Sequence, residues 1–238
     1  MMWGYLFGGE WYDDKAQKIT ADHPKNVEVL KWMKAYVDQI DVNQLEAFNS
    51  SLPDFWSPGN SFASKKTALR FDGFWTYDPL DQYAPDIDYG VGLFPTVNGT
   101  EEEKQNWGVR GWLVAVPAGV KDAAASWDFL KYGFVDNAWK MGCDTLNGSC
   151  VIAQMPKFEE CVTTKLGPDN RMTPYFNAFT ELGIKARRQF PVIPVNTQYL
   201  AELDRAYQYV IRNEKTPEEA LQEVTATIQA ELDKVMQG

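Results

Sequence analysis

Apolar residues recur at steps of three and four positions in three stretches of the chain, a period that is typical of amphipathic helices. The first stretch follows Pro24, and the other two cover residues 198–212 and 216–235. We expect the apolar side of each helix to face a core. The predicted core positions are Val27, Leu30, Met33, Val37, Ile40, Leu200, Leu203, Ala206, Tyr207, Val210, Leu221, Val224, Ile228, Leu232 and Val235.

The ends of these helices carry capping signals. Asp22 is the predicted N-cap of the first helix, which has a proline in its first turn. Thr216 and Glu219 have the spacing of a capping box, and the proline between them suits the first helical position. Residues 41–61 contain the proline- and glycine-bearing stretch SLPDFWSPGNS, which predicts a loop.

Period-two alternation predicts a strand at 66–71, with Leu69 and Phe71 on one face and Ala68 and Arg70 on the other. Directly after this strand come an acid, a glycine and two large aromatic residues, in the sequence DGFW. Side chains at the end of a strand tend to face a cleft or solvent. These aromatic residues therefore raise the question of a ligand.

Two more strands are predicted at 89–95 and 107–117, followed by a helical pattern that begins at Asp122. Together they form a strand–strand–helix unit over residues 88–135. The mixture of strands and amphipathic helices indicates the α/β class. The residues that this helix is expected to bring together are Trp127, Leu130 and Phe134.

Composition narrows the function. The 238 residues suffice for one large domain or two small ones, and a hydrophobic content of 45% supplies a sizeable core. Nine Trp, eleven Tyr and thirteen Phe exceed what a core alone requires, so some are expected to face a ligand. The net charge of -10, with scattered Lys and Arg, argues against nucleic acid and against an anionic membrane surface as partners. No apolar run approaches the roughly 20 residues of a membrane span.

Motifs for chemistry are weak. The single histidine, His23, is read as a solvated residue at a helix start rather than as a catalytic base. Gly90-Val91-Gly92 lacks the third glycine and the following helix of a phosphate-binding loop. Asp13-Asp14 and Glu101-Glu102-Glu103 lack the alternating spacing of a calcium loop. We predict no metal and no cofactor. A glycosidase stays open as the alternative, because it needs only two facing carboxylates, but the 33 acidic residues single out no pair.

The three cysteines, Cys143, Cys150 and Cys161, match no standard zinc-binding pattern. Either Cys143 and Cys150 form a disulfide across the polar DTLNGS loop, with one free thiol left over, or all three thiols are reduced and partly buried. Spacing alone does not decide between the two.

Several stretches, taken in order, resemble one family. They are the glycine pair Gly8-Gly9 before a polar turn, TADHPKNVEVLKWM, FASKKTALRFDGFW, YGVGLFP with VRGWLVAVPAG and SWDFLKYGF, and the terminal TPEEALQEVTATIQAEL. In this order they resemble the extracellular solute-binding proteins of ABC importers, in the maltose-binding-protein-like, sugar-binding group. The sequence departs from the family pattern at Ser64, at Arg110 and in the CDTLNGSC segment. These departures leave the ligand open.

The resemblance implies an incomplete type II periplasmic-binding-protein-like fold, whose complete form has two α/β lobes. Residues 1–84 and 139–238 are expected in the second lobe, and 85–138 are expected to complete the first. We expect the chain to be a fragment whose strand edges rearrange or pair with a second molecule. The resemblance also implies a periplasmic or extracellular location, with or without a membrane anchor, and under it the lack of a signal peptide in this chain carries no weight.

The resemblance further implies capture of a solute, expected to be a sugar or oligosaccharide, for delivery to a membrane permease by closure of the lobes. Trp75 matches the family's stacking aromatic residue. Gly111 would allow close approach of the backbone, with Arg110 or Trp112 reaching the sugar. From the residues alone, Trp75 either stacks on a ligand or covers the core, Trp112 can face either way, and Phe74 is assigned to the core.

Overall fold

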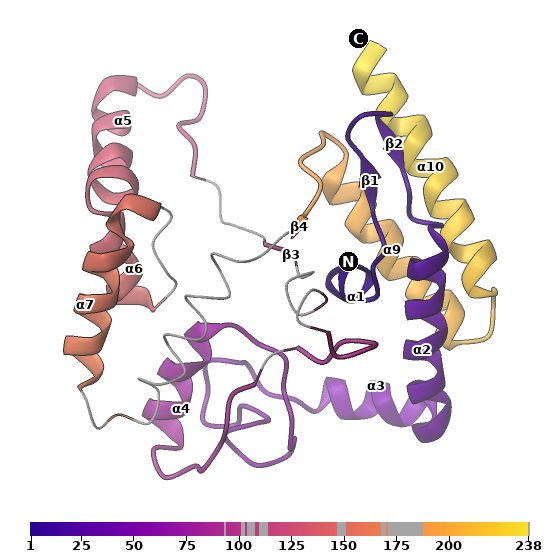
Figure 1. Cartoon of the computed structure of the whole chain (residues 1–238), viewed down its shortest axis with the longest axis horizontal. Helices are drawn as coiled ribbons and strands as arrows, with labels where there is room; N and C mark the ends of the chain where they lie inside the picture. Colours follow the sequence, from indigo (N-terminus) through magenta and orange to yellow (C-terminus); the bar gives the residue numbers. More distant parts are fainter. Residues whose placement is uncertain are drawn as a thin grey trace. The chain divides into compact units, whose positions relative to one another are not determined.

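A computed structural model of the chain describes residues 1–92, 94–100, 103, 108–109, 114–146, 151–167, 170 and 188–237. The chain divides into two compact units (Figure 1). Unit 1 comprises Met1–Ser51, Leu93–Arg110 and Ala186–Gly238, and unit 2 comprises Leu52–Gly92 and Gly111–Lys185. These boundaries differ from the predicted segments 1–84, 85–138 and 139–238, whose assignment to lobes stays a prediction.

Unit 1 is built on the three helices that the apolar period predicted. They are α2 (Pro24–Ile40), α9 (Asn196–Ile211) and α10 (Pro217–Gln237), accompanied by α1 (Met2–Leu6) and α3 (Val42–Ser50). Their apolar faces meet in one core, in which Tyr199, Val210 and Ile228 are fully buried. Of the fifteen predicted core positions, Ile40 and Val235 are exposed, because each lies in the last turn of its helix. Helix α3 falls in the predicted loop 41–61, so that prediction is wrong over 42–50.

The caps agree with the sequence at α10 and differ at α2. Thr216 Oγ1 accepts the Glu219 N–H at 3.2 Å, and the Glu219 carboxylate accepts the Thr216 N–H at 2.9 Å, which confirms the capping box. The N-cap of α2 is His23, whose Nδ1 accepts the Lys25 N–H at 3.2 Å. The prediction of Asp22 is therefore wrong, because its carboxylate instead accepts the Thr225 hydroxyl of α10 at 2.8 Å.

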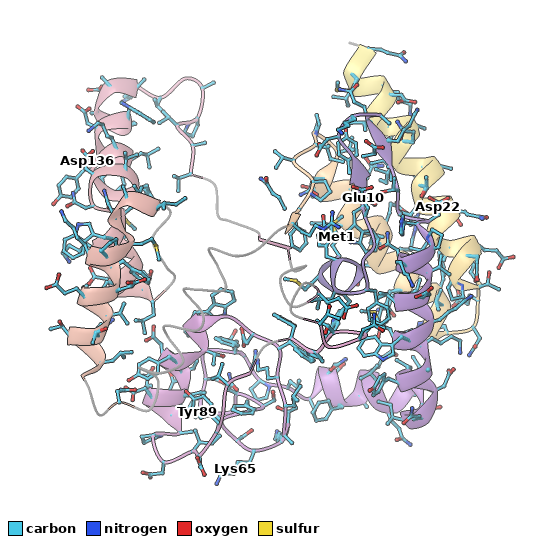
Figure 2. All side chains as sticks on the ribbon, viewed as in Figure 1. Met1, Glu10, Asp22, Lys65, Tyr89 and Asp136 are labelled. Carbon is cyan, nitrogen blue, oxygen red and sulfur yellow. A yellow bond between two sulfur atoms is a disulfide. The ribbon has the colours of Figure 1, made fainter. Side chains whose placement is uncertain are left out.

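A short antiparallel hairpin, β1 (Tyr12–Asp13) with β2 (Lys18–Ile19), lies between Glu10 and Asp22, both labelled in Figure 2. The buried side chain of Asn26 holds it in place, since its Nδ2 donates to the carbonyls of Glu10 and Thr20 at 2.7 and 3.1 Å. A Cβ atom at Gly9 would collide with Asn26 Oδ1. The second residue of the glycine pair is thus required by this buried asparagine.

Unit 2 is helical in its described residues. Its elements are the 3₁₀ helix η1 (Phe74–Thr76), α4 (Tyr77–Tyr83), α5 (Ala123–Lys131), the π-helical turn η3 (Tyr132–Asp136), α6 (Ala138–Thr145), the 3₁₀ helix η4 (Ile152–Gln154) and α7 (Met155–Leu166). Helix α5 confirms the helical pattern after Asp122, which is its N-cap. Trp127, Leu130 and Phe134, however, are at most partly buried.

A disulfide joins α6 to α7, but it pairs Cys143 with Cys161 and not with Cys150. The two helices pack against each other and bring the Cα atoms of Cys143 and Cys161 to 6.1 Å, which is within the usual range for a disulfide. Sequence proximity favoured Cys150, whereas helix packing places Cys161 beside Cys143. The predicted Cys143–Cys150 bond is therefore corrected.

The strand predictions fail over most of their length. In the described part of the chain, residues 66–71 and 89–95 form no strand, and 107–117 contributes only β3 (Gly108–Val109). Strand β3 pairs in parallel with β4 (Arg188–Gln189), in the register Gly108 to Arg188 and Val109 to Gln189. Alternation stabilises a strand only when a neighbouring strand accepts its backbone hydrogen bonds. Among the described residues, no helix has the length and apolar character to cross a membrane.

Candidate functional site

Trp75 lies at the surface of unit 2, in the middle residue of η1. Its side chain is 40% exposed, so it is not a core residue in this structure. A Cβ atom at Gly73 would collide with the six-membered ring of Trp75, which shows that the indole lies directly over the Gly73 backbone. Glycine at position 73 is therefore what lets the ring lie flat against the chain.

Asp72 ties the start of this 3₁₀ helix together. One carboxylate oxygen accepts the Gly73 N–H at 2.8 Å, and the other accepts the Thr76 hydroxyl at 2.9 Å. The same oxygen pairs with Arg70 Nε at 2.6 Å. These contacts brace the turn that carries Trp75 from both sides.

Arg70 links this turn to the loop before it. Its guanidinium carbon stands 4.4 Å from the centre of the Phe55 ring, and one of its terminal nitrogens donates to Asn60 Oδ1 at 3.2 Å. The Phe55 ring in turn meets the Trp56 ring edge-on, with centroids 4.7 Å apart. We name this group the aromatic platform: Phe55, Trp56, Arg70, Asp72, Gly73 and Trp75.

The platform combines flat apolar rings with fixed polar groups. A sugar ring presents a face of C–H groups and a rim of hydroxyls, so the first suits an indole face and the second suits charged or amide groups. A binding site of this kind needs mostly apolar surface with a few well-placed polar groups. Among the described residues, no group of three His, Cys, Asp or Glu side chains is arranged to hold a metal ion.

One ionisable group in the adjoining helix has a shifted pKa. Asp78 lies in the first turn of α4, where burial raises the pKa of its carboxyl group, while the positive charge of Lys165 acts in the opposite direction. Asp81 also raises it. Asp78 therefore holds a proton to higher pH than an exposed aspartate does.

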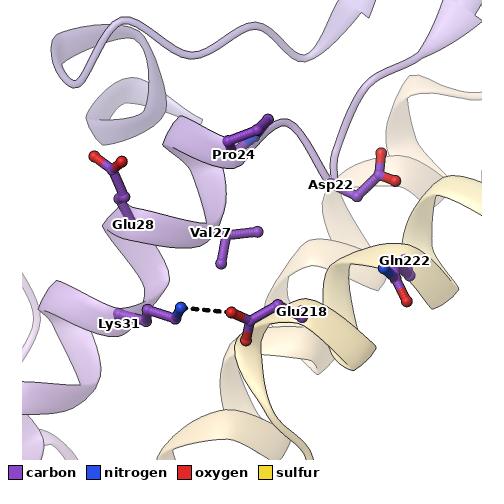
Figure 3. A pocket seen from close by; sticks show the side chains of 7 residues that line it. All are labelled: Asp22, Pro24, Val27, Glu28, Lys31, Glu218 and Gln222. Atoms are coloured by element: carbon purple, nitrogen blue, oxygen red, sulfur yellow. Dashed lines mark ion pairs between the residues drawn. The ribbon is translucent and has the colours of Figure 1, made fainter.

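Two hollows lie within unit 1, and no platform residue lines either of them. The first, of about 350 Å³, lies between α2 and α10, where Lys31 and Glu218 point toward each other in an ion pair of 2.5 Å (Figure 3). Both of these side chains are solvated, and the pair is typical of a helix–helix surface contact. The second, of about 270 Å³, is lined mainly by apolar side chains of α1, α2 and α9. The platform has the better chemistry for a ligand, although it is no deep pocket.

Of the predicted ligand-binding residues Trp75, Arg110, Gly111 and Trp112, the structure describes only Trp75. Arg110, Gly111 and Trp112 lie outside the described residues, as does the side chain of Phe74, so their roles stay predictions. Sequence reasoning missed Phe55, Trp56, Arg70 and Asp72 as members of the site. The run DFWSPGN, with two aromatic residues inside a polar turn, is the sequence signal that could have indicated Phe55 and Trp56. No sequence signal indicated Arg70, because the alternating pattern placed it on one face of a predicted strand.

Comparison with known proteins explains the order of the motifs. Residues 1–139 match the model of a family described as bacterial extracellular solute-binding proteins, which is more than half of the chain. The chain belongs to this family. The family is described by the binding of solutes and not by catalysis, so the glycosidase alternative is set aside.

Known proteins resemble this chain at low sequence identity. The maltotriose-binding protein of Pyrococcus abyssi is 23% identical over 131 residues, which are 53% of this chain and 26% of that protein. Structures of CpMnBP1 with mannotriose and with mannobiose bound each match 95% of this chain at 18% identity, with TM-scores of 0.68 and 0.70. A solute-binding protein of an ABC transporter from Thermotoga lettingae TMO, bound with α-D-tagatose, matches 98% of the chain at 19% identity with a TM-score of 0.64.

The chain spans only part of these relatives, namely 55–56% of each structure. The structural matches confirm part of the fold prediction, namely the likeness to periplasmic-binding-protein-like structures. Within the described residues of this chain the fold is mostly helical, with its strands reduced to four two-residue segments.

Proposed function

We propose that this chain takes part in binding a sugar or oligosaccharide as a portion of the solute-binding component of an ABC importer, and that Trp75 is a stacking platform for the sugar. The observation that carries the proposal is the exposed Trp75 indole, which is held over Gly73 beside the Arg70–Asp72 pair. An exposed aromatic ring that is braced by polar contacts is ready for a ligand without further ordering.

The exposed area sets the size of the effect. A tryptophan side chain buries about 150–250 Å² when it is fully covered. An exposed fraction of 40% leaves about 60–100 Å² for a ligand, or about 1.5–2.5 kcal/mol at 25 cal/mol per Å². A micromolar complex needs about 8.2 kcal/mol, so Trp75 would contribute about a quarter of it.

The ligands of the relatives support a sugar as the class of ligand, since those proteins bind mannooligosaccharides, maltotriose and tagatose. Membership of the family supports two further parts of the proposal, transfer of the ligand to a membrane permease and closure of two lobes around it. The disulfide between Cys143 and Cys161 supports a location outside the cytoplasm, because such bonds persist in oxidising compartments.

Thermal stabilisation tests the proposal. A ligand at 100 times its Kd stabilises the folded state by about 2.7 kcal/mol. We expect mannotriose or maltotriose to raise the Tm of the wild-type chain without forming any product, and Trp75→Ala to reduce that shift while its ligand-free Tm stays close to wild type. The matched control is Trp127→Ala, which removes an indole of 56% exposure from α5 and should keep the full shift.

Two results would contradict the proposal. The first is a wild-type Tm that none of mannotriose, maltotriose and tagatose changes. The second is a Trp75→Ala variant that loses about 3–5 kcal/mol of folding stability, as truncation of a core tryptophan does, and still shows the full sugar shift.

A further inference from the structure

Helix α5 lies at one end of the row of helices α5, α6 and α7 in unit 2 (Figure 1). Its Phe129 and Tyr132 side of the chain is open, since these residues are 73% and 68% exposed. Among the described elements, α5 packs closely only against η3, the turn into which it continues. We propose that α5 is a docking surface for a second copy of this chain, and that the two copies form a weak dimer through Phe129 and Tyr132. The inference is independent of the proposed function, because the dimer needs no sugar.

The two aromatic rings lie on one face of the helix. Residues that are three positions apart in an α-helix are neighbours on its surface. The backbone stays helical through Tyr132, whose φ and ψ are -57° and -49°. Trp127 stands two positions before Phe129, which turns it by about 200° around the helix axis. Phe129 and Tyr132 therefore form one aromatic surface, which we name the α5 face, and Trp127 is not part of it.

Exposed aliphatic side chains surround η3, which follows the α5 face. Val135 and Met141 are 45% and 37% exposed, and Ile152 is 80% exposed. Met141 packs at Gly133 of η3, since a Cβ atom there would lie 3.0 Å from the Met141 Sδ. Gln154 Nε2 donates to the Val135 carbonyl at 2.8 Å, which holds η4, with Ile152, at the end of η3. The surroundings of the α5 face are therefore apolar too.

The local charge favours a copy of the same chain as the partner. The whole chain has a net charge of -10, so two copies repel each other over most of their surfaces. Residues 123–135 contain one carboxylate, Asp128, and one ammonium group, Lys131, so this stretch is neutral. Lys131 is already paired with Asp136 at 2.6 Å, which leaves little to attract a nucleic acid or an anionic membrane. At the α5 face, two acidic chains can meet without like-charge repulsion.

An antiparallel pair of α5 helices brings the rings of two copies together. Around a two-fold axis between positions 130 and 131, Phe129 of one copy lies opposite the partner's Tyr132, and this aromatic pair is formed twice. The exposed fractions of Phe129 and Tyr132 leave about 210–350 Å² per copy for the partner. A standard interface buries about 800 Å² per partner, so we expect a reversible dimer with a micromolar Kd rather than a permanent one.

Sedimentation equilibrium of the 238-residue chain, from micromolar to submillimolar concentration, measures the dimer. Every sample carries Cys150→Ala, so that no disulfide between copies through this thiol mimics the dimer. Phe129→Asp and Tyr132→Lys each place a charge in the apolar contact and should weaken the dimer by at least about tenfold. The matched control is Trp127→Asp, which should keep the wild-type Kd within about twofold.

A mixture of the two charged variants tests the antiparallel register. In the mixed dimer the introduced carboxylate faces the introduced ammonium group in one half of the contact, while the other half keeps its native aromatic pair. The mixture should therefore dimerise more tightly than either variant alone. Added NaCl should strengthen the wild-type dimer, because it screens the repulsion between the acidic chains.

Several results would overturn the inference. A chain that stays monomeric over this range refutes it, and so does a dimer that Phe129→Asp and Trp127→Asp weaken equally or that salt weakens. A mixture that dimerises no better than its components refutes the antiparallel register. Hydroxyl-radical footprinting that finds Phe129 protected at the lowest concentration shows that another part of the same chain covers the α5 face, which also refutes the dimer. Should an aspartate variant melt early, Phe129→Ser and Trp127→Ser are read in its place. Sugar-induced Tm shifts test the proposed function separately.

Discussion

Helix α10 of unit 1 and helix α5 of unit 2 are both rich in apolar residues but use them differently. Helix α10 buries one stripe, which includes Leu221, Val224, Ile228 and Leu232, and presents charged residues on its other side. Helix α5, with the sequence AAASWDFLK, has no fully buried residue among those described. The charges of α10 direct its apolar stripe to a core, whereas α5 is apolar on several sides and cannot bury all of them against one neighbour.

The comparison extends to the units as wholes. Among the described residues, unit 1 has one large core formed by α2, α9, α10 and the hairpin, while unit 2 has two small cores, one of them around the Cys143–Cys161 bond. Exposed aromatic side chains gather in unit 2, among them Trp56, Trp75 and Trp127. Within the described residues, apolar packing therefore stabilises unit 1 more than unit 2, in which a disulfide adds a covalent link and several aromatic side chains stay exposed.

The largest expected effect is the loss of stability on truncating a side chain in the core of unit 1. Ile228 is fully buried in α10, so Ile228→Ala should lower the free energy of unfolding by about 2–5 kcal/mol, through lost transfer energy and the cavity left behind. Chemical denaturation with a fixed m-value measures it. Phe129→Ala, in the exposed part of α5, should change it by less than about 0.5 kcal/mol. An equal loss from both variants would remove the contrast between the helices.

Breaking the disulfide should affect unit 2 alone. The bond joins residues that are 18 positions apart in sequence. A link of this length lowers the conformational entropy of the unfolded chain, which stabilises the folded state by about 3 kcal/mol. Cys161→Ala should destabilise α6 and α7 by about that amount, and hydrogen exchange should rise in these helices while exchange in α9 and α10 stays unchanged. Cys150→Ala is the matched control, because Cys150 has no part in this bond, and it should leave exchange as in the wild type. Faster exchange across unit 1 would contradict the expectation that this bond stabilises unit 2 alone.

The smallest expected effect concerns Asp78 in α4. Because burial raises the pKa of this carboxyl in the folded state, the folded protein binds its proton more tightly than the unfolded chain does. Its contribution to stability is thus fully present below the ordinary pKa of an aspartate and is lost as the pH rises through the folded pKa. In the Asp78→Asn variant, the free energy of unfolding should decrease less between acid and neutral pH than it does in the wild type. Urea melts at several pH values measure this slope, and an unchanged slope in the variant would contradict the assignment.

Local patterns were enough to predict the helices of unit 1. The apolar period of α2, α9 and α10, and the capping box of Thr216 with Glu219, involve residues within a few positions of each other, so they can be read from the sequence. The family and the exposed position of an aromatic residue after Gly73 were also within reach of sequence patterns. Each of these features depends on residues that are close to one another in the sequence.

Contacts between distant residues decided the rest. His23 and not Asp22 is the N-cap of α2, because the Asp22 carboxylate accepts a hydrogen bond from Thr225, about two hundred residues away. Cys143 pairs with Cys161 because α6 packs on α7, and the alternating run 66–71 is no strand because no partner strand lies beside it in the described part of the chain. Arg70 joins the aromatic platform for the same reason, since only the folded loop brings Phe55 under its guanidinium. The sequence determines which local structures are favourable, and the tertiary structure determines which partner each polar group, thiol and strand edge meets.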